Sequence, residues 1–161
     1  MNRVTFVRFS RAMLAACTLM LTLGNASAAD NGIVKVQSNY ALAETVERLK
    51  KDVAAKGIKF FQEIDQAKLA GDAGIKINSS VLLIFGNPPL GTLFIKANPV
   101  AGLDWPVRLL VYQDEAGAVW TAYTDFAYIA RRHNIAGNDI KPFKTASGVI
   151  ASITSSVAKS K

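Results

Sequence analysis

The stretch Ser80-Val81-Leu82-Leu83-Ile84-Phe85, with the turn Gly86-Asn87-Pro88 after it, decides the fold. The run is apolar after its serine and does not alternate, so it predicts a strand that is buried on both faces or interior to a sheet. The turn predicts a short helix through Ala97. A phosphate cradle is the alternative at such a junction. Pro88 and Pro89 lack the amide hydrogens that would hold an anion, so a structural turn is favoured.

The flanking segments alternate between strand and helix signals. Strand signals lie at Ile33–Val36, Ile58–Ile64, Trp105–Tyr112 and, after a hairpin turn, Ala118–Thr124. Two longer helices are expected from apolar residues at helical spacing; these are Leu42, Val46, Leu49 and Val53 in the first, and Phe143, Ala146, Ile150, Ile153 and Val157 in the second, which we expect over Ile140–Lys159. The order β-α-β-β-β-β-α with short helical inserts predicts an α+β two-layer sandwich, in which two longer helices cover a mixed or antiparallel sheet.

Side-chain oxygens at the expected helix starts predict caps. Ser38 or Asn39 can cap the first long helix, Asp65 a short segment over Gln66–Ala73, and Asp125 a short helix over Phe126–His133. The large aromatic residues are interpreted as core residues rather than as a cofactor site: Phe60, Phe61, Phe85, Phe94, Trp105 and Trp120.

The first 28 residues have the three parts of an export signal. Arg3, Arg8 and Arg11 form a basic start, Ala12–Leu23 is a short apolar run, and small residues follow up to Ala28 and Ala29. Cleavage is expected after Ala28, with Ala29 second, which leaves a single α+β domain over residues 29–161 in the periplasm or secreted. A lipoprotein processed at Cys17 is the alternative, but most of the apolar run follows that cysteine.

Removal of the signal would also remove every sulfur atom. The chain has three methionines and one cysteine, and all of them lie within the first twenty residues. Thiol nucleophiles, disulfides and iron–sulfur clusters are therefore excluded for the mature chain. Its 16 Lys and Arg against 12 Asp and Glu give a net charge of +4 instead of +7. Because these charges are dispersed, we expect no nucleic-acid partner, and the short apolar run predicts no stable membrane span after cleavage.

Several segments together resemble the bacterial family known as domain of unknown function 302. The likeness extends over about residues 32–158, and its most specific element is the Phe-Gly-Asn-Pro block. The segments that carry it are Glu44–Leu49, Glu63–Asp65, Leu82–Pro88, Trp120–Tyr123 and Arg132-His133. The resemblance implies a TBP-like β-α-β4-α fold and a homodimer, and it brings no established reaction. Many relatives carry histidine where this chain has Gln66, so a family site that used that histidine is in doubt here.

Few side chains of the mature chain could carry chemistry. The candidates for ligand binding are Asn87, Asp104, Arg108, Tyr123, Asp125 and His133. The aspartates are also natural cap or turn residues. His133 near a helix end is interpreted as a surface or terminal-cap residue. The sharper alternative makes it a haem or other metal ligand, with a second subunit or a nearby tyrosine assisting. No mononuclear zinc site is expected from a single histidine.

Three functions follow from these features. The preferred one is a noncatalytic exported domain that binds a small apolar or amphipathic molecule in a cleft between sheet and helices. The second is an enzyme that uses Asp, Arg and Tyr side chains, and the third is a homodimeric interaction module. Catalytic residues and the identity of a cofactor stay unassigned.

Overall fold

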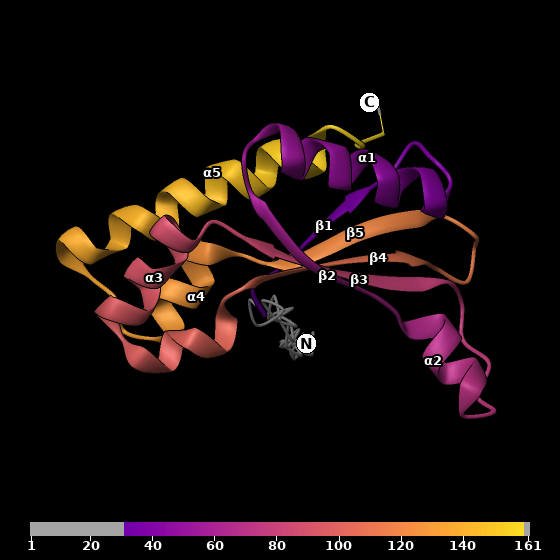
Figure 1. Ribbon diagram of the computed structural model, residues 1–161, viewed down its shortest axis with the longest axis horizontal. Helices are drawn as coiled ribbons and strands as arrows, with labels where there is room; N and C mark the ends of the chain where they lie inside the picture. The colour runs from indigo at the N-terminus through magenta and orange to yellow at the C-terminus, as the bar shows by residue number, and fades with distance from the viewer. Residues whose placement is uncertain (1–30, 160–161) are drawn as a thin grey trace, which may run out of the picture.

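The computed structural model describes residues 31–159, and the export signal expected at residues 1–28 lies outside this range. Five strands form one sheet, and two long helices cover one of its faces (Figure 1). The strands are β1 (Ile33–Gln37), β2 (Lys59–Asp65), β3 (Ser80–Gly86), β4 (Val107–Gln113) and β5 (Val119–Thr124). The helices are α1 (Leu42–Ala55), α2 (Gln66–Asp72), α3 (Pro88–Ala97), α4 (Phe126–Arg132) and α5 (Lys141–Ser155), with 3-10 turns η1 (Pro99–Asp104) and η2 (Gly137–Ile140).

The sheet has the order β1-β5-β4-β3-β2 and every pairing is antiparallel. This confirms the α+β sandwich, and of the two sheet types expected, mixed or antiparallel, the sheet is antiparallel. β3 is interior to the sheet, as its apolar run predicts, but only one of its faces is fully buried. Val81, Leu83 and Phe85 point into the core, whereas Leu82 and Ile84 on the other face are half-buried.

The core lies between the inner face of the sheet and the two long helices. All residues named above for the two apolar helix faces are buried except Leu42, which packs against the core from its edge. The second helix is shorter than the expected Ile140–Lys159, since α5 ends at Ser155 and Val157 lies beyond it. Phe143 of α5 stacks on Phe94 of α3, with ring centroids 4.1 Å apart. This stack joins α3 to the layer formed by α1 and α5.

Two of the predicted caps are present. Asp65 accepts a hydrogen bond from the Lys68 amide at 2.8 Å, and Asp125 accepts one from Tyr128 at 3.1 Å. The prediction for α1 is wrong, because its N-cap is Ala41 and no side chain caps it. The Ser38 hydroxyl instead forms a 2.7 Å hydrogen bond with the Thr45 hydroxyl.

The aromatic residues divide between core and surface. Phe85 and Phe94 are buried as expected, whereas Phe60 and Phe61 are 36% and 40% exposed. Phe61 lies at a register shift between Phe60 and Gln62, which turns its side chain out of the regular alternation. Phe61 meets the half-buried Trp105 ring edge-on, with centroids 6.2 Å apart.

Trp105 lies directly against the backbone of α3. A Cβ on Gly91 would lie 1.8 Å from the indole nitrogen of Trp105, which no real contact tolerates. Glycine is therefore required at this position because of the close approach.

We expect Gly91→Ala to lower the free energy of unfolding by about 1–3 kcal/mol, since the added methyl must displace the indole ring. Gly148→Ala in α5 is the matched control, because a Cβ at Gly148 meets nothing within 4 Å. That control should raise stability by up to about 1 kcal/mol through helix propensity. Urea unfolding followed by circular dichroism measures the stability of both variants. Equal changes in the free energy of unfolding would show that the close approach of Trp105 does not require glycine at position 91.

Candidate functional site

The sequence-predicted candidates fall into three places in the fold. Asp104, Arg108 and His133 meet where η1 and β4 approach the end of α4. Asn87 is the N-cap of α3, where its Oδ1 accepts from the Leu90 amide at 3.1 Å. Tyr123 and Asp125 lie at and just after the end of β5. No single cleft therefore gathers the whole set.

The first place is built around a buried carboxylate. Asp104 Oδ2 and His133 Nε2 share a 2.6 Å hydrogen bond, and both side chains are almost fully buried. Because an ionised carboxylate can only accept, Nε2 carries the hydrogen. Arg132 lies 3.3 Å from the other carboxylate oxygen and Arg108 lies 3.8 Å from it. One negative charge thus faces two guanidinium groups.

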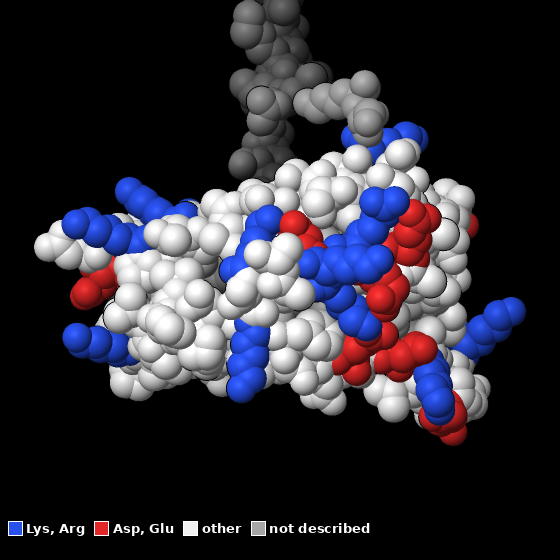
Figure 2. All heavy atoms as spheres, turned by 45° about the horizontal axis from the view of Figure 1, so that its top comes forward, with Lys and Arg blue, Asp and Glu red and all other residues white. Residues whose placement is uncertain are grey.

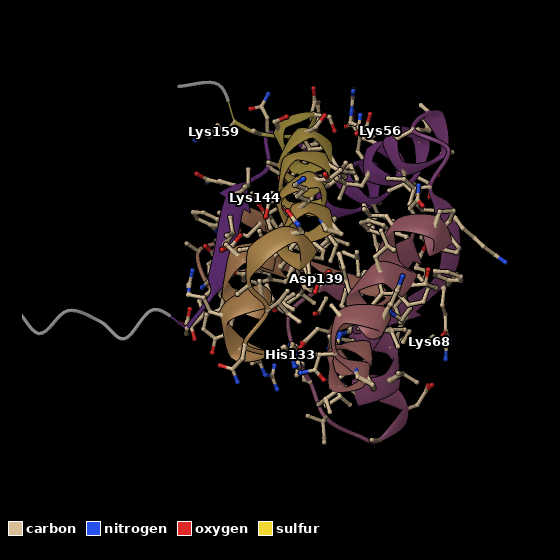
Figure 3. All side chains as sticks on the ribbon, turned by 90° about the vertical axis from the view of Figure 1, so that its left-hand side faces the viewer. Lys56, Lys68, His133, Asp139, Lys144 and Lys159 are labelled. Carbon is tan, nitrogen blue, oxygen red and sulfur yellow. The ribbon has the colours of Figure 1, made fainter. Side chains whose placement is uncertain are left out.

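His133 ends α4 as its C-cap residue, but it is buried, so its interpretation as a surface residue is wrong. Figure 3 shows it at the end of α4, facing the segment that contains α3. Its carbonyl accepts from the Asn98 side-chain amide at 3.1 Å. Nε2 is engaged by Asp104, so in this arrangement an iron would have to be bound through Nδ1. Within residues 31–159, no three His, Cys, Asp or Glu side chains cluster closely enough to hold a metal ion.

The Asp104–His133 pair ties α4 to η1. Asp104→Ala leaves the buried imidazole without its partner, so we expect the free energy of unfolding to fall by about 1–3 kcal/mol. His133→Leu and the double variant complete a mutant cycle, and we expect a coupling energy of about 0.5–3 kcal/mol. Chemical denaturation measures each term. Additive losses would show that the two side chains do not act as a pair.

Tyr123 belongs to the helix-covered side of the sheet. Its ring is 8% exposed. Burial, together with the nearby Asp125 charge, raises the pKa of the Tyr123 hydroxyl, while a hydrogen bond with Thr154 of α5 partly offsets the rise. Arg108 pairs with Ile84 on the other face of the sheet. Both residues border one hollow on that face, but the Tyr123 hydroxyl is engaged with Thr154 on the helix-covered side.

Sequence reasoning expected an apolar cleft between sheet and helices but did not locate the apolar hollow of the structure. It lies between α3, α5 and the ends of β3 and β4, and it has a volume of about 40 Å³. Phe85, Phe94 and Ile150 are among the buried side chains that line it, and Trp105 and Asn87 stand in its wall. An apolar cleft was expected from composition alone. The residues of its wall could not be predicted, because the contact of Trp105 with Gly91 of α3 forms only in the folded chain.

A surface groove of about 390 Å³ leads to this hollow. The two share Ile58, Asn87, Leu90 and Val149, so the groove forms the mouth of the hollow. Lys56, Thr145 and Ser152 add polar groups along the groove, and neither space has an acidic lining residue. Figure 2 agrees with this distribution: red acidic side chains gather over the α1 half of the helix-covered face, whereas the part over α5 is mostly uncharged.

The profile of the family "Domain of unknown function DUF302" matches residues 34–154. The chain belongs to this family. The DUF302 chain is also similar to a solved structure, the uncharacterized conserved protein DUF302 from Bacillus stearothermophilus, with a TM-score of 0.72 at 17% identity. That likeness covers 79% of this chain and 98% of the other, and it shows a shared fold.

Three Brucella proteins are also similar to this DUF302 chain. Fluoride-specific ion channel FluC 1 of Brucella suis biovar 1 and FluC 2 of Brucella melitensis biotype 1 are each 35% identical over 128 residues. The match covers 78% of this chain but only 50% and 47% of those proteins, so the chain spans about half of their length. Separately, none of the helices between residues 31 and 159 is long and apolar enough to cross a membrane.

Proposed function

We propose that this DUF302 chain is an exported, noncatalytic binding domain that takes a small apolar or amphipathic molecule in the groove between α3 and α5. The observation that carries the proposal is the space that runs from the groove, with its few polar groups, into the apolar hollow, since the two share four lining residues. Ligand sites combine an apolar lining with a few polar groups that fix orientation, and both parts are present here. The fluoride-specific ion channel named for the Brucella relatives is not part of this proposal.

The dimensions set the kind of ligand. A single water needs about 10–15 Å³, so a hollow of about 40 Å³ accepts the end of an alkyl chain or a small ring substituent, and the rest of the molecule lies in the groove. Each buried methylene contributes about 0.8 kcal/mol. Asn87 and Lys56 at the mouth offer polar contacts to the outer end of an amphipathic molecule.

The arrangement of titratable groups supports a noncatalytic role. Asp104 and His133 are buried and hydrogen-bonded to each other, and Asp125 is committed to the N-terminus of α4. None of these three lines the hollow or the groove. The enzyme alternative therefore has no carboxylate or imidazole in the lining of the proposed site. The homodimer implied by the family resemblance stays a prediction.

The groove is tested by filling it. Gly148 lines the groove and its Cβ direction is open, so Gly148→Phe should project a ring into it without a clash. We expect the wild type to bind the apolar fluorophore N-phenyl-1-naphthylamine. Because the added ring occupies the groove, the variant should bind the fluorophore at least about tenfold more weakly, which is a loss of roughly 1.4 kcal/mol of binding free energy.

Gly71→Phe in α2 is the matched control, since Gly71 is also a helical glycine with nothing within 4 Å of its Cβ position. It should bind the fluorophore like the wild type. Absence of binding to the wild type, or equal affinity in both variants, contradicts the groove proposal.

Export is tested by the mass of the protein recovered from the periplasm of a bacterial host. We expect a chain that begins at Ala29, or at Asp30 if cleavage follows Ala29. An acylated chain that begins at Cys17 would replace this proposal by the lipoprotein, and Cys17→Ser should leave processing near Ala28 unchanged. An uncut chain that stays in the cytoplasm would contradict export.

A further inference from the structure

The face of the sheet opposite α1 and α5 carries a pattern that the fold does not require. Its middle row runs across all five strands as Lys35, Ala122, Leu110, Leu82 and Ile64. Four of the five are apolar. This face explains why the β3 sequence does not alternate, since Leu82 and Ile84 point outward and are half-buried.

The two neighbouring rows complete the face. One contains Gln37, Trp120, Tyr112 and Ser80. The other combines the pair Ile33–Thr124 with the run Arg108, Ile84 and Gln62, and Thr124 and Arg108 border the same hollow. None of these side chains is acidic, and Lys35 and Arg108 are the cations. In Figure 1 the two long helices lie above the sheet, while α2 projects beyond the side that bears these rows.

The positive charge on this face is only partly compensated. Lys35 makes no ion pair within residues 31–159, and its ammonium group lies 5.9 Å from the centre of the Tyr112 ring. Arg108 donates to the Leu103 carbonyl at 2.8 Å and is 3.8 Å from Asp104. That carboxylate is already shared with His133 and Arg132. The nearby Asp114 is held by Trp120 Nε1 at 2.7 Å and by the Ala118 amide at 2.8 Å.

A hollow lies within the same face. Its volume is about 360 Å³, and its lining includes both cations together with Leu82, Leu110 and Tyr112. Small-molecule sites start at about 300 Å³, so this space fits one small molecule. The three rows extend about 19 Å by 14 Å from strand and residue spacings, roughly 270 Å². A stable protein partner buries about 800 Å² on each side, which is three times more.

We infer that this sheet face binds a free single-chain anionic amphiphile, of the long-chain carboxylate class. The acid group lies between Lys35 and Arg108, and the chain crosses Leu110 and Leu82. Because the rows contain two cations and no acidic side chain, they favour a negatively charged ligand. The apolar middle row favours a ligand with an apolar tail. The site is separate from the groove between α3 and α5, which lies on the helix-covered side.

The test is titration of the purified protein with monomeric dodecanoate, followed by amide shifts in heteronuclear NMR. We expect saturable shifts at Leu82, Leu110 and Tyr112, and little response to dodecyltrimethylammonium, which has a comparable chain and the opposite charge. The double variant Lys35→Gln/Arg108→Gln should bind dodecanoate about tenfold more weakly, since it loses two charge contacts.

Lys51→Gln/Lys144→Gln is the matched control, because it removes two exposed charges from α1 and α5, away from this face. Its affinity for dodecanoate should equal that of the wild type. Equal losses in the two double variants, or equal binding of the cationic amphiphile, would overturn the inference.

Three further results would also overturn it. The first is loss of dodecanoate binding in Gly148→Phe but not in Lys35→Gln/Arg108→Gln. The second is binding of phosphatidylglycerol vesicles without binding of monomeric dodecanoate. The third is a protein dimer in sedimentation whose formation shields this face from dodecanoate. The first leaves the groove proposal standing. Failure of the fluorophore test with normal dodecanoate shifts on the sheet would instead reject the groove proposal and leave this one intact.

Discussion

Within residues 31–159, α1 and α5 cover one face of the sheet only, and this one-sided burial governs the rest of the described structure. The inner residues of β3 and β4, such as Leu83, Phe85 and Leu109, are removed from water against the two helices. Burial of side chains of this size contributes about 1.5–3 kcal/mol each, which makes this layer the main source of stability. The outer face contributes less to the core, so its residues are free to serve recognition.

The α3 region adds a second packing constraint. The Phe94–Phe143 stack holds α3 to α5, while Gly91 lets Trp105 approach the helix backbone closely. A larger residue at Gly91 would push Trp105 outward, and a looser stack would let α3 drift from α5. Both contacts involve residues that line the hollow, so they help to fix its walls. Packing and proposed binding share the same residues here.

Features that depend on near neighbours could be predicted from the sequence, and features that depend on distant contacts could not. Asp65 and Asp125 act on amides three residues away, so their cap positions were readable from local spacing. Ser38 is drawn instead to Thr45, and α1 begins uncapped. The partner of His133 is 29 residues distant, and nothing in its local sequence indicates burial. Leu82 and Ile84 were predicted to be buried, because a strand with apolar residues on its outer face has the same sequence pattern as a strand buried on both faces.

The pairing of β1 with β5 has a consequence for the life of the chain before it is folded. Ile33 lies opposite Thr124, so the first strand has no partner until the last strand has been made. At the usual rate of synthesis, roughly 5–20 residues per second, this delay lasts on the order of 5–20 s. Closing such a long loop early is entropically unfavourable. With this topology, β1 therefore stays unpaired by β5 while the intervening residues are being synthesised.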